Sequence, residues 1–434
     1  MPALPTAILR YLTSPGGTAL ARGNIVFAAL LAGFTPLAGS GVSVVVAVTM
    51  CWGILLLAGK RLAFPAQRQA WLAAGAFALF FITEALATGL SGFSSDGMQE
   101  IAENLPFLGV LPLFALMTAR PATLLRTLYL AAAAGGLLAG AAALGFLLFQ
   151  PDKRLELMAG NPLVLALAAS VMNGLALAGA LRLRGWERNI CLAGAMAAAF
   201  LVISSESRTY WFGLLAMPVA MAAVHMRATR TKALVLAGMV LTAGATAFLA
   251  YTYLPVVQER IEAVSTDLEK ARNSDLNTSL GQRFVVWETA RQLIREKPVF
   301  GHGGGDIPGL MAERNAETGG YTFAFTHFHN AILNVLVRGG IVNLAGFLAA
   351  FLAPLVLLWI NRHSVHGRAA LTAGIAVYLP YCLSGVTGLV FGHDIHDALF
   401  IGLSVVCLQA SFPGQDDERQ GDDGQAPDLR LAMR

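Results

Sequence analysis

Residues 253–260, Tyr-Leu-Pro-Val-Val-Gln-Glu-Arg, decide the fold, because a long series of apolar spans stops there. Polar and charged sequence then continues to His329-Asn330, where apolar residues return. The other gaps between apolar spans are mostly much shorter. This pattern predicts one large loop, residues 254–329, between two membrane-embedded parts of the chain.

The composition places the rest of the chain in a membrane. Of 434 residues, 56% are hydrophobic and 13% are charged, whereas an ordinary soluble protein carries about 25% charged residues. The apolar stretches have the length of about 20 residues that a membrane-spanning helix needs. We therefore predict an all-α polytopic membrane protein. Its formal net charge of +4 does not indicate a nucleic-acid partner.

The hydrophobic pattern predicts about twelve transmembrane helices. The fourth is short and opens beside Pro106, so we expect it to be tilted or broken. The segment 330–339 continues the tenth span toward the loop and is amphipathic, which is typical of a helix at the membrane interface. The predicted spans are 21–38, 42–58, 70–90, 104–118, 124–149, 162–181, 188–204, 209–226, 233–253, 340–360, 369–388 and 395–412.

Lysine and arginine in the short loops predict the orientation. With a cytoplasmic N-terminus, the inner short loops hold thirteen of these residues and the outer ones hold only Lys153, Arg154 and Arg208. Short cytoplasmic loops are enriched in positive charge. We therefore expect cytoplasmic termini and a large loop that faces outward, into the periplasm if the source is a Gram-negative bacterium. The predicted parts are a membrane domain of nine spans (1–253), a periplasmic loop domain (254–329), a second membrane part (330–412) and a disordered cytoplasmic tail (413–434).

Chemistry on the outer side has no ATP or nucleotide sugar to draw on, so it needs a donor that is already activated and carried by a lipid. Such donors present phosphate or pyrophosphate at the level of the headgroups. A protein that uses them needs fixed cations at the outer ends of helices and a base.

Arg208 is the first candidate cation. It follows Ser204-Ser205-Glu206-Ser207 in a polar break between two apolar spans. Arginine stays charged and binds phosphate oxygens in a bidentate manner, and a helix N-terminus adds positive potential. The alternative is an arginine that only marks topology, with Glu206 as its partner.

Arg283 and His329 are the second and third candidates. Arg283 opens a predicted amphipathic helix that continues to Ile294, with apolar residues at helical spacing. His329 ends the loop, where the headgroup of a bound lipid would lie, and an imidazole can accept a proton near neutral pH. The alternatives are an exposed charge at a helix start and an ordinary interfacial histidine.

Three other features carry weaker signals. Residues 300–306, Phe-Gly-His-Gly-Gly-Gly-Asp, resemble a phosphate cradle but lack its flanking strand and its Lys-Ser/Thr ending, so a tight turn is favoured. Residues 393–397, His-Asp-Ile-His-Asp, have metal-ligand types, but a hydrogen-bonded cap is favoured and no metal site is predicted. Glu84 is the one acidic residue well inside a predicted span; we expect it to pair with a backbone group or a tyrosine hydroxyl rather than to act in function.

Taken in order, four motifs carry a family resemblance. They are Ser207-Arg208 at the start of a span, Gly281-x-Arg283 followed by Trp287, the Phe-Gly-x-Gly turn at 300–303, and His329-Asn330 followed by Gly340. This ordered set resembles the bacterial O-antigen ligase and O-antigen polymerase superfamily over residues 200–345. Where the family pattern has Gly, Thr or Tyr shortly after the glycine, this chain has Asn343.

The resemblance implies a metal-independent, inverting glycosyl transfer without a cofactor, on a fold similar to the C-type membrane glycosyltransferases. It implies a polysaccharide donor on undecaprenyl pyrophosphate and an acceptor hydroxyl on the lipid A–core, within membrane lipid. His329 would take the acceptor proton, and Arg208 and Arg283 would hold the pyrophosphate. Supporting or donor-orienting roles are expected for Tyr210, Gln282, His327 and Asn330.

Three rival functions remain open. A polysaccharide polymerase and a protein O-oligosaccharyltransferase would use the same donor and differ in their acceptor. A transporter of lipid-linked polysaccharide belongs to another class. Transporters usually place polar groups at mid-membrane in two similar halves, and this chain has little deep polarity and no similarity between its halves.

Overall fold

The computed structural model describes residues 18–150, 153–225, 251–253, 255–272, 276, 278–319 and 325–413, together with positions 234, 237, 238, 241, 244 and 248. Helices and turns make up these residues, and no strand occurs among them. In the first half of the chain the α-helices are α2 (Thr18–Gly33), α3 (Thr35–Ala38), α4 (Gly41–Ala58), α5 (Arg68–Leu90), α6 (Ser95–Glu103), α7 (Val110–Leu116), α8 (Pro121–Phe149), α9 (Pro162–Arg182), α10 (Gly185–Ser204) and α11 (Arg208–His225). The later ones are α13 (Pro255–Arg272), α14 (Ser279–Glu296), α15 (Ile307–Gly319), α16 (Ala331–Ile360), α17 (Gly367–Thr387) and α18 (Asp394–Ser411), and short 3-10 turns are η1 (Leu105–Gly109), η2 (Leu157–Ala159) and η3 (Asn361–His363).

Eight of these helices are long and apolar enough to cross a membrane, and the parts of α2 and α11 at 19–33 and 208–224 are shorter apolar helices. The chain is therefore an all-helical, multi-pass membrane protein, as its composition predicts. The fourth predicted span is broken, as expected, into η1 and α7. The ninth, 233–253, lies mostly outside the described residues, as do most of the predicted tail and residues 1–17. The count of twelve spans stays a prediction.

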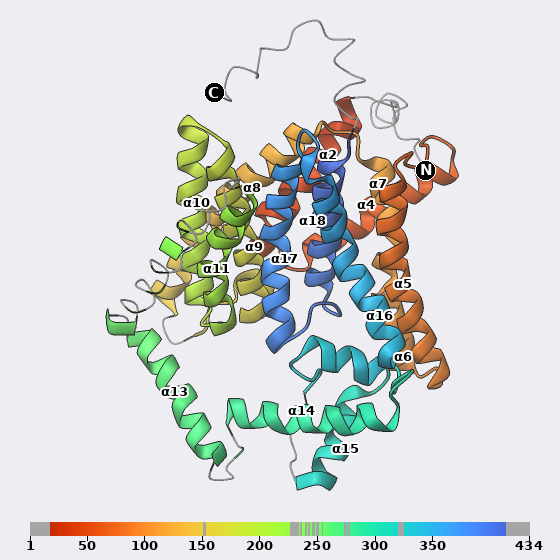
Figure 1. Cartoon of the computed structure of the whole chain (residues 1–434), viewed down its shortest axis with the longest axis vertical. Coiled ribbons are helices and arrows are strands. Elements are labelled where there is room, and N and C mark those ends of the chain that lie inside the picture. The colour runs from red at the N-terminus through yellow and green to blue at the C-terminus, as the bar shows by residue number, and fades with distance from the viewer. Residues whose placement is uncertain are drawn as a thin grey trace, which may run out of the picture.

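The membrane helices surround α9 and α18, which are the most buried of the spans (Figure 1). Aromatic side chains fill the space around α18. The Phe400 ring lies 5.0 Å from the Tyr378 ring, 5.0 Å from the Tyr381 ring and 5.1 Å from the Phe391 ring, measured between centroids. Offset and edge-to-face aromatic pairs of this kind add about 0.5–1.5 kcal/mol each to packing.

Small residues bring the helices on the other side of the bundle into close contact. A Cβ atom added to Gly194 of α10 would lie 2.4 Å from the Cα atom of Ala133 in α8. Membrane helices pack closely where glycine and alanine line the interface, because dispersion contacts rather than water exclusion hold them together. The Ala/Gly-rich sequence of α8 therefore serves close packing.

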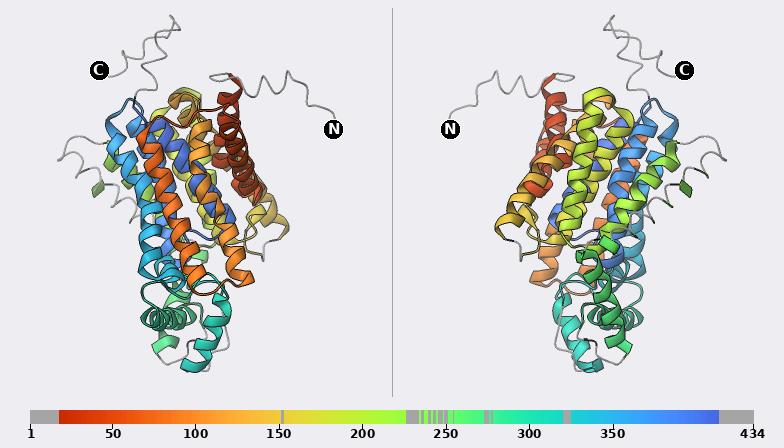
Figure 2. Two further views of the ribbon diagram at one scale, coloured as in Figure 1. Left: turned by 90° about the vertical axis from the view of Figure 1, so that its right-hand side faces the viewer. Right: turned by 90° about the vertical axis from the view of Figure 1, so that its left-hand side faces the viewer.

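The loop domain lies beyond one end of the bundle, and two side views show the same arrangement (Figures 1 and 2). The amphipathic helix predicted for the loop is present as α14, and α13 is a second helix of the loop. The loop has its own apolar core, which joins α14 and α15 to the first part of α16. Its buried members are Val286, Ala290, Leu293, Ile307, Met311, Phe328 and Val337. This core fixes the position of α14 against the segment that carries His329.

Candidate functional site

Arg208 is the first residue of α11, after a tight turn at Ser205–Ser207. The Ser207 hydroxyl donates to the Pro162 carbonyl over 3.3 Å, and the Arg154 guanidinium donates to the Ser205 carbonyl over 3.0 Å. Glu206 has a φ of +57°, which is uncommon for a residue with a side chain. These contacts and this strained backbone fix the N-terminus of α11, so the backbone of Arg208 is held in a defined position.

Arg283 is the fifth residue of α14 and lies at the start of its second turn, so the helix begins four residues before its predicted start. The helix is capped by Thr278, whose hydroxyl accepts the N–H of Gly281 over 3.0 Å. One turn after Arg283, the Trp287 indole donates to the Phe328 carbonyl over 3.0 Å. The Gly-x-Arg…Trp motif therefore combines a capped helix start, a cation and a tether to the His327–His329 segment.

His329 sits in a constrained position just before α16. Its φ of +49° falls in the left-handed region, and its ring centroid lies 4.5 Å from that of His327 and 4.7 Å from that of Phe325. Its Nδ1 is buried and has no hydrogen-bond partner among the described residues. The ring is thus held in one orientation, and its Nδ1 is a buried polar atom that the described residues leave unsatisfied.

The three predicted site residues converge from three distant elements. Burial lowers the pKa of Arg283, and the charge of Arg208 lowers it further. Burial, and then the charge of Arg283, lower the pKa of His329 to about 4, while a hydrogen bond to the backbone of Thr387 opposes this shift. The Thr387 hydroxyl in turn lies 2.9 Å from that of Thr209, the neighbour of Arg208. The site thus combines two like charges and an imidazole that is neutral at pH 7.

The four predicted supporting residues divide into two kinds. Asn330 caps α16, because its side-chain oxygen accepts the N–H of Leu333 over 3.0 Å; Tyr210 is buried and hydrogen-bonds to Ser384. Gln282 and His327 are part-buried neighbours of Arg283 and His329. Asn330 and Tyr210 are therefore placed to support helices, whereas Gln282 and His327 lie beside the candidate catalytic groups.

The glycine motifs of the sequence meet at a break in α16. Gly340 has a non-helical backbone (φ +60°, ψ −158°) that interrupts the helix. The turn predicted at 300–303 and the residues just before it lie against this break. They form hydrogen bonds with the backbone groups that lose their helical partners there. His302 and Gly303 donate their N–H groups to the carbonyls of Val337 and Arg338 over 2.8 and 2.7 Å, and Ile341 and Val342 donate to the carbonyls of Pro298 and Val299 over 2.9 and 3.3 Å.

Only glycine fits at the two points of closest approach. A Cβ atom on Gly301 would lie 2.6 Å from the Arg338 carbonyl, and one on Gly340 would lie 2.3 Å from the Val299 carbonyl. The prediction of a tight turn rather than a phosphate cradle is thus confirmed. The Phe-Gly-x-Gly turn and the break at Gly340 in the His-Asn…Gly motif thus form one close backbone contact, which we call the joint. Residues 331–339 form a separate short helix that precedes the membrane span.

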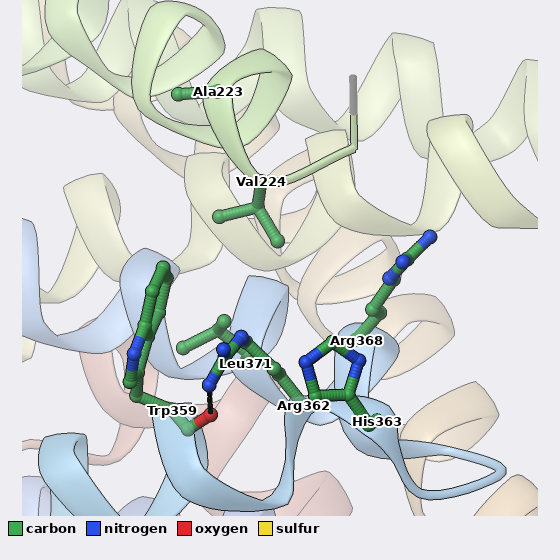
Figure 3. A pocket seen from close by; sticks show the side chains of 7 residues that line it. All are labelled: Ala223, Val224, Trp359, Arg362, His363, Arg368 and Leu371. Atoms are coloured by element: carbon green, nitrogen blue, oxygen red, sulfur yellow. Dashed lines mark hydrogen bonds between the residues drawn. The ribbon is translucent and has the colours of Figure 1, made fainter. Parts of the chain in front are cut away.

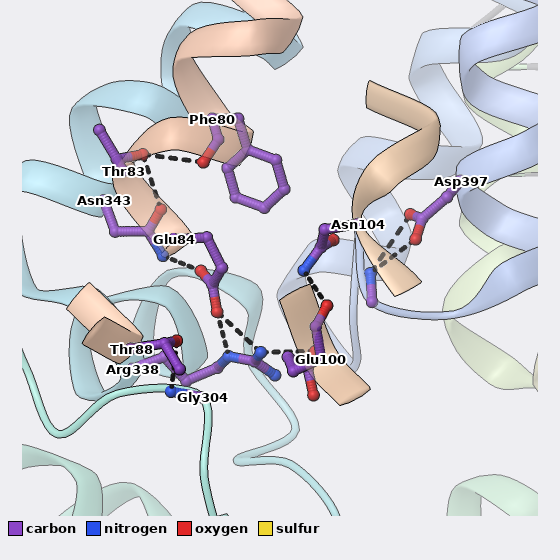
Figure 4. Close-up of polar contacts among 11 residues, drawn as sticks. Phe80, Thr83, Glu84, Thr88, Glu100, Asn104, Gly304, Arg338, Asn343 and Asp397 are labelled. Atoms are coloured by element: carbon purple, nitrogen blue, oxygen red, sulfur yellow. Dashed lines mark hydrogen bonds and ion pairs between the residues drawn. The ribbon is translucent and has the colours of Figure 1, made fainter. Parts of the chain in front are cut away.

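An ion network lies directly behind this joint (Figure 4). The Arg338 guanidinium binds Glu84 of α5, with Nη2 2.7 Å and Nε 2.9 Å from the carboxylate Oε1, and it also binds Glu100 of α6. Asn343 donates to the other Glu84 oxygen and accepts from Thr83. Our expectation that Glu84 pairs with a backbone group or a tyrosine is therefore wrong. An acid this deep needs a full countercharge, and Arg338 supplies it.

Sequence reasoning missed Arg338 and Thr387. The signal for Arg338 was present, because a lone carboxylate inside a span calls for a cation and Arg338 stands directly before Gly339-Gly340. The cap predicted at 393–397 is confirmed: Ser43 donates to Asp394 over 3.1 Å, and Gly392 donates its N–H to Asp397 over 3.2 Å. Within this segment, His393 lies near enough to His327 to lower its pKa.

Together, the fold and the site define a multi-pass membrane protein with a cationic, histidine-containing site where a loop domain meets the bundle. Residues 193–348 match the sequence model of the family described as O-antigen ligase. This stretch contains all four motifs and all three converging residues. The predicted resemblance to the O-antigen ligase family is thereby confirmed over this part of the chain.

A relative from Haemophilus influenzae, itself described as an uncharacterized protein, is 26% identical over 176 residues. The matched part covers 39% of this chain and 44% of that protein, so less than half of each is compared.

Proposed function

We propose that the protein is an O-antigen ligase. It would transfer polysaccharide from undecaprenyl pyrophosphate to a sugar hydroxyl of the lipid A–core on the periplasmic side of the bacterial inner membrane. The observation that carries this proposal is the convergence of Arg208 and Arg283 beside His329. Two guanidiniums close enough to disfavour each other's charge are stabilised when an anion with several oxygens binds between them.

In the proposed reaction, the acceptor hydroxyl attacks C1 of the first donor sugar. His329 takes the hydroxyl proton as the new C–O bond forms, and the bond between C1 and the pyrophosphate oxygen breaks. The lipid pyrophosphate leaves with the bonding electrons, and the two arginines stabilise its growing charge. A single displacement from the face opposite the leaving group inverts the configuration at C1. No metal or cofactor takes part in this scheme.

Donor binding would also prepare the base. In the free protein, burial and Arg283 hold the pKa of His329 at about 4, which makes it a weak proton acceptor. Pyrophosphate between the arginines would offset the charge of Arg283 and raise this pKa toward neutral, where general-base catalysis is more effective. The base would thus reach full strength only when the donor is in place.

The test is transfer by purified protein from a lipid-linked polysaccharide to three acceptors: lipid A–core, a second lipid-linked repeat and an unfolded peptide. A ligase uses the first, a polymerase the second and a protein O-oligosaccharyltransferase the third. His329→Ala should lower the rate by about 10²–10⁴-fold without loss of folded protein. Cells that carry this variant should make lipopolysaccharide without polymer while polymer accumulates on its carrier.

Two outcomes would contradict the proposal. Wild-type protein that moves lipid-linked polysaccharide across vesicles but transfers none would indicate a transporter. An unchanged rate in His329→Ala would remove the histidine from the chemistry.

A further inference from the structure

A cavity of about 150 Å³ lies at the end of the membrane bundle away from the candidate site, and Figure 3 shows the side chains that line it. It opens where α11 ends beside the η3 turn, which joins α16 to α17. Since His329 precedes α16 and η3 follows it, the whole of this helix separates the two places. The lining residues are Ala223, Val224, Trp359, Arg362, His363, Arg368 and Leu371.

The cavity is cationic. Two arginines and a histidine line it, and its seven lining residues include no acidic side chain. Within the part of the chain that the structure describes, neither Arg362 nor Arg368 forms an ion pair. In contrast, Arg126 at the same end of the bundle pairs with Glu187. The cavity therefore concentrates positive charge that no carboxylate of its lining balances.

Arg362 is held in a fixed position. It donates through Nη1 to the Trp359 carbonyl over 2.7 Å, and its guanidinium carbon lies 4.3 Å from the centroid of the Trp359 ring. The indole face attracts a cation without neutralising it. Most donors of this guanidinium thus remain available, and they are already oriented for a planar, bidentate ligand such as a phosphate.

Trp359 lines the cavity, and apolar residues close to it in the sequence are exposed, which indicates where the ligand comes from. Trp359 is 54% exposed and Val365 is 84% exposed, and Val356 and Ile360 of α16 also face outward. Such surface at the end of a membrane span contacts lipid, and tryptophan prefers the level of the headgroups. A cavity of this volume holds a phosphate group, since a single water needs only about 10–15 Å³.

We propose that this cavity binds the phosphate of an anionic lipid in the leaflet opposite the candidate site. Arg362 and Arg368 would bind the phosphate oxygens, and the acyl chains would lie along Val356 and Ile360 of α16. Basic pockets between membrane helices are suited to such headgroups. Because α16 also carries the joint at Gly340, a lipid bound here would stabilise the far end of the helix on which the candidate site is built.

The experiment measures thermal unfolding of the purified full-length protein in detergent. Phosphatidic acid, phosphatidylcholine and inorganic phosphate are added separately at matched concentrations. Phosphatidic acid should raise the midpoint in a saturable manner. The zwitterionic lipid and inorganic phosphate should have little effect. In Arg362→Gln and Arg368→Gln, the concentration of phosphatidic acid that gives half the effect should rise about ten-fold, the loss expected for one charged hydrogen-bonding partner.

Arg188→Gln is the matched control, because Arg188 is exposed at the start of α10 and does not line the cavity. It removes the same charge and should respond to phosphatidic acid as the wild type does. An equal response in the double variant Arg362→Gln/Arg368→Gln would overturn the site. An equal effect of phosphatidylcholine would overturn the charge selectivity. An equal effect of inorganic phosphate would overturn the lipid source.

Discussion

Arg338 and Arg283 both lie at the loop end of the molecule, but the charges that surround them are opposite in sign. Arg338 lies between the carboxylates of Glu84 and Glu100, with Asn343 completing the network. Arg283 forms no ion pair with any described carboxylate, and the charge that acts on it most is that of Arg208. Arg338 is thus neutralised inside the protein, whereas Arg283 lies near a second arginine and pairs with no described carboxylate.

We infer from this difference that Arg338 has a structural role and that Arg283 has a functional one. A buried cation between two acids has no capacity left for a ligand, so it holds helices together. Two cations set close together cost stability in the empty protein and gain it when an anion binds. Arg338 therefore connects α5, α6 and α16, and we propose that Arg208 and Arg283 bind the donor pyrophosphate. The predictions that follow test this division.

The largest effect is expected when the neutralised arginine is removed. Arg338→Ala leaves the buried Glu84 and the part-buried Glu100 without a cation, which costs about 3–5 kcal/mol of folding free energy. The measurement is the midpoint of thermal unfolding in detergent. Arg291→Ala is the control, because this arginine is exposed and pairs only with Glu288 three residues away, and exposed pairs contribute little.

A second variant checks the reason for that loss. Replacing all three charges together, in Glu84→Gln/Glu100→Gln/Arg338→Met, should recover most of the stability, because no unpaired charge remains. If Arg338→Ala unfolds at the wild-type temperature, the ion pairs of Arg338 do not stabilise the contact between α5, α6 and α16.

The next effect concerns the like-charged arginines. Arg283→Ala should reduce the transfer rate by about 10²–10³-fold. It should leave the unfolding midpoint unchanged or slightly raised, because the repulsion from Arg208 is removed. Arg283→Lys should also be impaired, since an ammonium cannot form the bidentate contact. The measurement is the initial rate with lipid-linked donor.

Arg295→Ala supplies the comparison on the same helix, since Arg295 is exposed near the other end of α14. Its rate should equal that of the wild type. A fall in stability rather than in rate for Arg283→Ala would place Arg283 in the structural group with Arg338.

Sequence pattern could locate the loop end of the molecule because the signals there are local. The change from apolar to polar sequence, the amphipathic spacing of α14 and the turn-forming glycines at 301 and 303 each depend on neighbouring residues. The order of the motifs then indicated that Arg208, Arg283 and His329 act together, although nothing in the spacing fixed their geometry.

The ion network could not be predicted in the same way. Glu84 and Arg338 are 254 positions apart. In the sequence, Glu84 is a lone polar group in a span and Arg338 is part of an amphipathic segment, so neither indicates the other as its partner. Asn343 departs from the family pattern but forms part of this network. The role of each of these residues depends on a partner in another helix, and local periodicity does not predict which residues of different helices pair.

A smaller effect is expected at the joint itself. Gly340→Ala places a side chain at φ +60°, which costs about 1–2 kcal/mol, and it also forces the Val299 carbonyl to move. The unfolding midpoint should fall and the transfer rate should drop several-fold, because the short helix behind His329 shifts. Gly75→Ala in α5, with no atom within 4 Å of its new Cβ, should be neutral or stabilising. Equal behaviour of the two variants would show that the break at Gly340 is not required.

The smallest effect is a shift in the pH dependence of the rate, and it tests most directly whether Arg283 lowers the pKa of His329. In the free protein the pKa of His329 is about 4, so the base stays neutral well below pH 6.5. The value of kcat/KM for the donor should therefore hold constant as pH falls to about 5 and decline only through pH 4, because this parameter reports the free enzyme. The value of kcat reports the donor complex, in which bound pyrophosphate offsets Arg283. It should begin to decline at a higher pH. Arg283→Gln removes the charge that lowers this pKa, so its kcat/KM profile should move upward toward the kcat profile. Two wild-type profiles with the same midpoint near 6.5 would mean that His329 does not sense the arginines, and the proposed preparation of the base by the donor would fail.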